Sequence, residues 1–345
     1  MIIHSLATLL ALLHAALLVL LVVWQRTHRR HPNRRLPWPY LALAPFSFWF
    51  GTLSLPILAL APFVRAIPYT ASAIVSMASF LVFYLIEPLW PKVRQPTSPT
   101  TTTLRAMSTN LFKANDAHDA IAETILASRA DLVAVQELRP SQAEALASLL
   151  RHAYPYQDLH PGRDAEGMGL FSRYPITRRE TVRLDGANPI QIVRLLVEQQ
   201  PLALINMHPR IPRLKQGLLG LPVGLSTHAR GEDVAAIVRA AEPLLDPTLI
   251  MGDMNTTPYC PEYQALPRDW RDVHDIAERG LGLSYPVDAA FFGFRSPIPL
   301  FRIDHLFLRG PIVCRSLRRG RMPGSDHRYL VAQLALAAPK DLSDD

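Results

Sequence analysis

Asp253 and Asn255 stand two residues apart at the end of an apolar run, in LIMGDMNTTP at residues 249–258. If this run is a strand, residues i and i+2 point to the same face, so both side chains project into one small volume. Two oxygen-rich side chains aimed at one point form half of a site. The alternative is an Asx-type turn, because Gly, Asp, Asn, Thr and Pro are all turn formers.

Other polar residues follow apolar runs in the same way. Taken alone, Glu137 after VAVQ can be a solvated turn residue, and His208 in INMH can be a satisfied core histidine. Ligands and catalytic groups gather at strand ends in layered α/β folds, so several such strand ends together favour a common site. The residues concerned are Asn110, Glu137, His208, Asp253 with Asn255, Asp304, and Asp326 with His327.

Short apolar runs alternate with longer amphipathic ones from Leu104 onward, which predicts an α/β domain with many strands. Helices are expected at 118–129, 141–153 and 232–245, with Ser141 as a candidate N-cap. Strands are expected at 104–112, 131–138, 168–176, 191–199, 202–208, 247–255, 302–308 and 329–336.

The series of motifs resembles the endonuclease/exonuclease/phosphatase superfamily and stands in that superfamily's order. The match spans roughly residues 104–337, and the combined series is highly specific although no single motif is. The motifs are Asn110 after the first strand, VAVQE with Glu137, GLFSRYPI, INMH with His208, GDMN with Asp253 and Asn255, IDHLFL with Asp304, and GSDHR with Asp326 and His327.

The resemblance implies a four-layered α/β sandwich, two packed sheets flanked by helices, with the active site at one edge. It also implies a hydrolase that uses Mg²⁺, or Mn²⁺ in its place, to cleave a phosphate ester or phosphoanhydride. In the deoxyribonuclease branch a second histidine takes part, and His208 matches it. That histidine has a glutamate partner one strand earlier, where this chain has Glu166; the alternative for Glu166 is a solvated loop residue.

Hydrolysis of such a bond needs a cation on the non-bridging oxygens. Mg²⁺ prefers oxygen ligands and keeps several waters, so one or two carboxylates suffice. We therefore expect Glu137 to be the main metal ligand, with Asn110 beside it on the metal or the phosphate. Asp326 is expected to add a second metal contact.

The reaction also needs a base for the attacking water and a proton for the leaving oxygen. Asp253 is expected to orient or deprotonate the water, while Asn255 holds a phosphate oxygen. His327 is expected to contact the phosphate or to act as general acid or base. Asp304 would fix the tautomer of His327 by accepting from its ring N–H.

Residues 1–94 are predicted to be a transmembrane region. No Asp, Glu, Lys or Arg occurs from Met1 to Gln25, and this run is long enough to cross about 30 Å of hydrocarbon. Uncharged runs at 36–64 and 66–86 predict two further spans, the first of them rich in proline and therefore kinked or partly interfacial. A cleaved signal peptide is disfavoured, because a basic n-region is missing and the apolar stretch is too long.

The basic loop at residues 26–35, RTHRRHPNRR, contains much of the excess behind the formal net charge of +7. Beside a span, such a run indicates a cytoplasmic loop rather than nucleic-acid binding. Counted from this loop, three spans place the downstream domain in the cytoplasm.

Composition predicts a linker at 95–103, a catalytic domain at 104–338 and a tail at 339–345. Hydrophobic residues make up 49% of the 345-residue chain and charged residues 19%. The two cysteines, Cys260 and Cys314, are too few for a disulfide scaffold and show no metal-ligand spacing.

Two apolar segments suggest a lipid-linked substrate: the Gly/Leu/Pro-rich insertion at 209–231 and FFGF at 291–294. Either can cover a lipid chain or lie on the membrane interface, and the alternative is a surface loop packed on the domain. With the spans, they resemble the membrane branch of the superfamily, including proteins similar to the teicoplanin-resistance phosphatases that act on undecaprenyl pyrophosphate outside the cell. That resemblance places the domain outside, so the side of the membrane stays open.

The leading hypothesis is therefore a membrane-anchored phosphohydrolase acting on a lipid-linked phosphate such as a polyprenyl pyrophosphate, with the lipid bilayer as its partner. A sphingomyelinase-like phosphodiesterase is one alternative, and a non-catalytic binding module is another. No protein partner follows from the sequence. A membrane-tethered nuclease would act on nucleic acid through a basic groove, for which the candidates are Arg163, Arg173, Arg178, Arg179, Arg183 and Arg194.

Overall fold

The computed structural model of the chain describes residues 2–30, 37–86, 95, 100–183, 185–216, 222–278, 280–288, 290–291, 294–295 and 297–337. The chain divides into two units. The helical unit contains Met1–Pro91, Pro212–Thr227 and Thr256–Ala265, and the sandwich unit contains Lys92–Ile211, His228–Asn255 and Leu266–Asp345. The predicted tail, residues 31–35 of the basic loop and residues 96–99 of the predicted linker lie outside the described residues.

Two helices of the helical unit are long and apolar enough to cross a membrane. The first is Ile3–His28, 26 residues within α1 (Ile2–Arg30). The second is Ile67–Ile86, 20 residues formed by α5 (Ile67–Phe80) and the π-helical segment η2 (Leu81–Ile86). They correspond to the first and third predicted spans.

The second predicted span is broken rather than continuous. Its halves, Pro39–Thr52 and Ser54–Val64, meet at an angle of 48°, so they form a third span only if the bent pair counts as one. Pro56 has no N–H to donate to the carbonyl of Thr52 four residues earlier, which accounts for the break. The elements are α2 (Trp38–Leu43), η1 (Ala44–Phe46), α3 (Ser47–Thr52) and α4 (Ser54–Val64).

Two segments from the second half of the sequence also belong to the helical unit. One is the hairpin of β8 (Arg213–Gln216) and β9 (Pro222–Ser226), which lies in the insertion predicted after the strand INMH. The other contains α10 (Pro261–Gln264). In this second segment the ring of Tyr259 lies 5.4 Å from the ring of Tyr84, and its carbonyl accepts a hydrogen bond from the Tyr40 hydroxyl at 3.3 Å.

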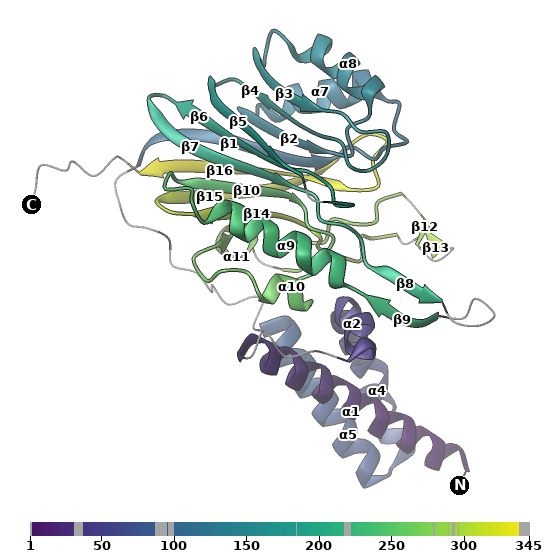
Figure 1. Ribbon diagram of the computed structural model, residues 1–345. Coiled ribbons are helices and arrows are strands. Elements are labelled where there is room, and N and C mark those ends of the chain that lie inside the picture. The colour runs from purple at the N-terminus through teal and green to yellow at the C-terminus, as the bar shows by residue number, and fades with distance from the viewer. Residues whose placement is uncertain are drawn as a thin grey trace, which may run out of the picture. The chain divides into compact units, whose positions relative to one another are not determined.

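The sandwich unit is built on two six-stranded mixed sheets (Figure 1). The first has the order β15 (Ile312–Arg321), β16 (Arg328–Ala337), β1 (Thr100–Asn110), β2 (Leu132–Gln136), β4 (Met168–Ser172) and β3 (Tyr156–His160). The second has the order β11 (Arg271–Asp272), β14 (Asp304–Arg309), β10 (Thr248–Asp253), β7 (Gln200–Met207), β6 (Ile190–Val197) and β5 (Ile176–Val182).

Each sheet is mixed because one pair of its strands runs parallel, β1 with β2 in the first and β7 with β10 in the second. A short hairpin, β12 (Ala290–Phe291) and β13 (Phe294–Arg295), contains the predicted apolar segment FFGF, whose two middle residues lie outside the described chain.

Apolar residues alternate along the strands and fill two layers of core. On β1, Leu104 and Ala106 belong to the cluster between the sheets, whereas Met107 belongs to the cluster beneath α7 (His118–Ser128) and α8 (Pro140–Leu150). Helix α9 (His228–Ala241) lies along the second sheet (Figure 1). The short helix α11 (Val273–Ala277) follows β11 in the sequence. This arrangement confirms the predicted four-layered α/β sandwich.

Two local predictions are corrected. Strand β1 begins at Thr100, inside the predicted linker, because Thr100 pairs with Ala337 of β16. Helix α8 begins at Pro140 with Arg139 as N-cap, not Ser141, and the Gln142 side chain accepts from the Arg139 N–H at 2.7 Å. The fixed φ of proline suits the first helical position.

Candidate active site

Asn110 and Glu137 lie next to each other at the ends of two parallel strands. β1 ends at Asn110, whose register partner on β2 is Gln136, so Glu137 follows at the same edge. The Asn110 amide donates from Nδ2 to Glu137 Oε1 at 3.1 Å, and the backbone N–H of Lys113 donates to Oε2 at 2.9 Å. The Glu137 carboxylate is therefore held through both of its oxygens.

The second sheet brings His208 and Asp253 to the same site. β10 ends at Asp253, and His208 follows Met207, the last residue of the parallel strand β7. Gly252 has a φ of +150°, and a Cβ there would lie 1.9 Å from the carbonyl oxygen of Met207. Only glycine permits this approach, so the packing of the two strands explains why a glycine precedes Asp253 in GDMN.

His327 is fixed between two carboxylates. Its Nδ1 lies 2.9 Å from Asp304 Oδ2, and its Nε2 lies 3.6 Å from Asp253 Oδ2. Asp253 and Asp304 are register partners on β10 and β14, which explains how one histidine reaches both. Burial alone would lower the pKa of His327, but Asp304 and Asp253 outweigh it and raise the pKa to about 10.

Asp253 is affected in the opposite direction. Burial disfavours its charged form, yet His327 and His208 lower the pKa of the carboxyl to about 2. The site therefore combines an ionised carboxylate with a protonated imidazole, which are the forms of a general base and a general acid.

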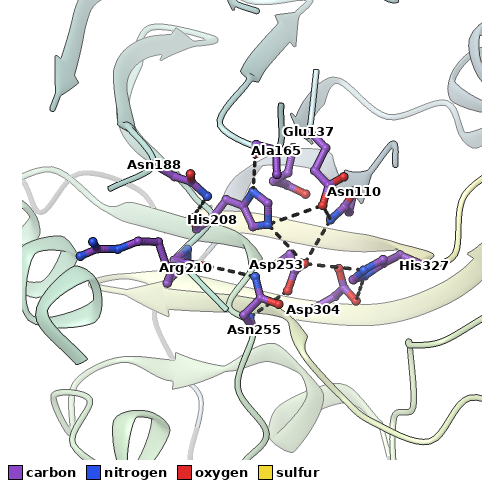
Figure 2. A network of polar contacts seen from close by, with 12 residues as sticks. Asn110, Glu137, Ala165, Asn188, His208, Arg210, Asp253, Asn255, Asp304 and His327 are labelled. Atoms are coloured by element: carbon purple, nitrogen blue, oxygen red, sulfur yellow. Dashed lines mark hydrogen bonds and ion pairs between the residues drawn. The ribbon is translucent and has the colours of Figure 1, made fainter. Parts of the chain in front are cut away.

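His208 approaches the same carboxylates from a third direction (Figure 2). Its Nε2 lies 3.6 Å from Asp253 Oδ2 and 3.9 Å from Glu137 Oε1. Burial would lower the pKa of His208, but Asp253 and Glu137 raise it. The structure thus places His208 within the predicted site.

The predicted partnership between Glu166 and His208 is not formed. The Nδ1 atom of His208 lies 3.0 Å from the carbonyl oxygen of Ala165, the neighbouring residue. The carboxylate of Glu166 accepts instead from the backbone N–H groups of Arg163 and Asp164, at 2.7 and 2.9 Å. A backbone carbonyl therefore orients His208, and Glu166 shapes the loop that supplies it.

The turn interpretation of GDMN is confirmed, because β10 ends at Asp253 and the predicted strand does not continue to Asn255. Asn255 has a φ of +51°, and its backbone N–H donates to Asp253 Oδ1 at 2.8 Å, which is an Asx-type turn. The other oxygen of Asp253, Oδ2, faces Asn110 and the two histidines. The Asn255 amide donates to the carbonyl of Pro209 at 2.9 Å, and its role in holding a phosphate oxygen stays a prediction.

Asp326 adds a further acidic group at the turn between β15 and β16. Burial raises the pKa of Asp326 and outweighs the charge of His327, which lowers it, while the charges of Glu137 and Asp253 raise it further. A divalent cation stabilises the charged form of such a carboxyl group. The donor set therefore fits the predicted metal site, with Glu137 and Asp326 as carboxylate ligands and Asn110 beside them.

A second group with metal-ligand spacing consists of Asp253, Asp304 and His327, whose donor atoms all lie within 4.8 Å of one another. Asp304 Oδ1 is buried and has no hydrogen-bond partner among the described residues. Because His327 Nδ1 is bonded to Asp304, only Nε2 of this ring is open to a metal ion. The group could hold a metal ion, and its role in proton transfer stays a prediction.

Sequence reasoning missed two residues of the site. The ring of Tyr285 lies 4.7 Å from the ring of His327, and burial followed by Asp326 and Asp253 raises the tyrosine pKa to about 12. Ser325 donates from Oγ to the carbonyl of Asn110 at 2.7 Å and accepts from the His327 N–H at 3.1 Å. Ser325 stood inside the motif GSDHR, whereas Tyr285 lies in an irregular segment without such a signal.

The fold and the site together define a hydrolase of phosphate esters. Residues 107–327, well over half of the 345-residue chain, match the Endonuclease/Exonuclease/phosphatase family. The chain belongs to this family, whose members depend on a divalent metal ion.

Solved structures share the fold at low sequence identity. D. rerio TDP2 complexed with single-strand DNA product is 17% identical, with a TM-score of 0.54 over 68% of this chain and 99% of that one. An endonuclease/exonuclease/phosphatase family protein from Bacteroides thetaiotaomicron is 18% identical, with a TM-score of 0.53 over 69% of this chain and 99% of that one. An endonuclease/exonuclease/phosphatase from Bacteroides vulgatus is 20% identical, with a TM-score of 0.52 over 68% of this chain and 100% of that one. No curated protein matches the chain.

Proposed function

We propose that this protein is a membrane-anchored, Mg²⁺-dependent phosphohydrolase that acts on a lipid-linked phosphate, with a polyprenyl pyrophosphate as the leading substrate. The apolar helices supply the anchor, and the family supplies the chemistry of phosphate ester cleavage.

The observation that carries the proposal is where the chain passes from one unit to the other. Only Pro209–Ile211 separates His208 from the hairpin segment that groups with the apolar helices, and Thr256 of the second such segment follows Asn255 directly. The chain therefore continues from the site residues at the ends of β7 and β10 into the unit with the candidate spans. This connectivity supports a substrate that the membrane itself supplies.

The site residues divide the reaction between them. Asp253 is ionised and accepts a proton from the attacking water, while His327, held by Asp304, donates a proton to the leaving oxygen from Nε2. His208 offers a second N–H to a phosphate oxygen near Asp253. A divalent cation held by Glu137 and Asp326 would neutralise charge on the non-bridging oxygens.

The arginines that a nuclease groove would require argue against the nuclease alternative. Four of the six candidates are paired with carboxylates, at distances of 3.2 to 3.6 Å. An arginine already paired in this way offers less free charge to a phosphate backbone. The pairs are Arg173 with Asp131, Arg178 with Glu180, Arg179 with Asp158, and Arg194 with Asp246.

The test is phosphate release by the detergent-solubilised full chain with Mg²⁺, offered undecaprenyl pyrophosphate and a DNA duplex in parallel. The variant Asp253→Ala/His327→Ala is the blank. The matched control is Asp269→Ala/His152→Ala, which removes the same two residue types from exposed positions.

Release from the lipid by wild type and control, lost in the blank and in EDTA, is the expected result. DNA nicking without lipid turnover would refute the proposal and establish the nuclease. Turnover of neither substrate would contradict the pyrophosphatase assignment and direct the assay to phosphodiester lipids.

A further inference from the structure

The outer face of the first sheet changes from apolar to polar along the strands β1, β16 and β15. Beneath α7 and α8 this face is apolar, and Val331 of β16 lies at the margin of that apolar cluster. Gln333 is the next residue of β16 on this face, and it pairs with Arg105 on β1 and with Ser316 on β15. Residues paired in register share a face, so these three polar side chains lie side by side on neighbouring strands.

A cavity of about 410 Å³ opens at this point. Every charged residue in its lining is an arginine, and the three come from three different elements: Arg105 from β1, Arg318 from β15, and Arg129 directly after α7. Ser316 and Gln333 add a hydroxyl and an amide. In the part of the chain that the structure describes, none of the three guanidinium groups has a hydrogen bond or an ion pair.

Some other arginines on the same unit are paired with carboxylates. Arg173 and Arg309, for example, are paired with Asp131 and Asp269, at 3.2 Å each. Three unpaired cations that share one cavity repel one another, and a bound anion removes that repulsion. The carboxyl end of α7 also borders the cavity, but its dipole is equivalent to only about half a negative charge, against three positive ones.

The chemistry of the lining selects phosphate. A guanidinium group presents parallel N–H donors that match two oxygens of a phosphate, and several such groups bind a multiply charged anion more strongly than a single carboxylate. The volume lies within the range of roughly 300–1,000 Å³ that is typical of small-molecule sites.

We propose that this cavity is a binding site for a diphosphate-class anion and is separate from the catalytic centre. Arg105 precedes Asn110 by five residues on the same strand, which corresponds to about 17 Å, and alternation places the two side chains on opposite faces of the sheet. The same phosphate chemistry is offered by a soluble diphosphate and by the headgroup of an anionic lipid.

The test is isothermal titration of the full chain in detergent with inorganic pyrophosphate, in EDTA and without Mg²⁺. Under these conditions no divalent cation offsets the carboxylates of the catalytic centre, so binding there is weaker than in the presence of Mg²⁺. Wild type is expected to bind pyrophosphate, and higher ionic strength is expected to weaken the binding. The variant Arg105→Gln/Arg318→Gln is expected to bind at least about 10-fold more weakly, because two charge-assisted contacts are lost.

The matched control is Arg239→Gln/Arg268→Gln, which makes the same change at two exposed arginines outside the cavity and should bind as wild type does. Arg129→Gln is a third variant at a position outside the strands, so the inference stays testable if the double variant does not fold. Equal binding by wild type, control and cavity variants, or no binding by wild type, would overturn the inference.

Nanodiscs distinguish the two sources of the ligand. If an anionic headgroup occupies the cavity, phosphatidic acid added to phosphatidylcholine discs will weaken pyrophosphate binding to the wild type but not to the cavity variants. Unchanged binding to the wild type identifies a soluble ligand. The cavity variants keep all the catalytic residues, so phosphate release tests the proposed function separately. A cavity that binds no pyrophosphate would leave that function untouched.

Discussion

The Nδ1 atom of His327 lies 2.9 Å from the Oδ2 atom of Asp304, so the ring donates a hydrogen bond to this buried carboxylate. Nε2 then faces Asp253 at 3.6 Å and is the nitrogen available for proton exchange. Asp304 thus fixes the orientation of the imidazole and stabilises its protonated form.

Replacing Asp304 with asparagine is expected to lower the rate of phosphate release by about 10²- to 10⁴-fold, the usual contribution of a general acid or base. The amide keeps the size of the carboxylate but neither stabilises the imidazolium nor fixes its tautomer. Initial rates measure the effect, with Asp269→Asn as a control at an exposed position. Full activity in Asp304→Asn, with thermal stability unchanged, would contradict this role.

Glu137→Gln is expected to weaken divalent metal binding at least about 10-fold, because the ion prefers charged oxygen ligands. Binding of Mn²⁺ followed by electron paramagnetic resonance gives the affinity directly. Glu242→Gln, at an exposed position, is the control. EDTA should abolish activity and added Mg²⁺ should restore it; activity that persists after chelation would exclude the metal site.

The structure brings together several residues that the sequence singled out at strand ends, and their catalytic roles stay predictions. Glu137, Asp253 and His327 follow or end apolar runs, and strand pairing in two sheets brings these runs to one edge. The polar residues were visible because they interrupt hydrophobic patterns, and the resemblance that their series shows to the superfamily implied the fold.

The prediction failed where the site uses a backbone atom or an irregular segment. The carbonyl of Ala165 orients His208, and a carbonyl leaves no signature in the residue type. Tyr285 reaches His327 from a stretch between α11 and β14 that has no hydrophobic period.

Strands β5 and β15 were missed for a different reason. Both are edge strands, with two arginines in β5 and four in β15, so they lack the apolar alternation expected of a strand. Charged edges of this kind prevent pairing with other chains.

The stability of the sandwich unit is expected to depend on pH through His274. Burial, followed by the charge of Arg302, lowers the pKa of His274 to about 4. The neutral ring is satisfied on both sides, since Nε2 donates to the carbonyl of Gly280 at 2.9 Å and Nδ1 accepts from Arg319 at 2.8 Å.

Because the folded pKa lies below the unfolded value of 6.5, this contribution is complete above pH 6.5 and is lost as the pH falls toward 4. The total loss is on the order of 3 kcal/mol. Chemical unfolding of the full chain at a series of pH values, followed by tryptophan fluorescence, should show this slope. His274→Gln should flatten it, and an identical slope in the variant would assign the effect to another group.

Tyr285 is expected to act through its ring. The ring lies 4.7 Å from the imidazole of His327, with 39° between the planes, and such aromatic contacts contribute about 0.5–1.5 kcal/mol beyond area burial. Tyr285→Ala removes this contact, so His327 is held less firmly and kcat is expected to fall roughly 10-fold.

Tyr285→Phe keeps the ring and is the matched control for the hydroxyl. It is expected to retain most of the activity and the thermal stability of the wild type. Steady-state kinetics of both variants separate the two contributions. If Tyr285→Phe loses as much activity as Tyr285→Ala, the hydroxyl rather than the stacked ring is the group that the reaction uses.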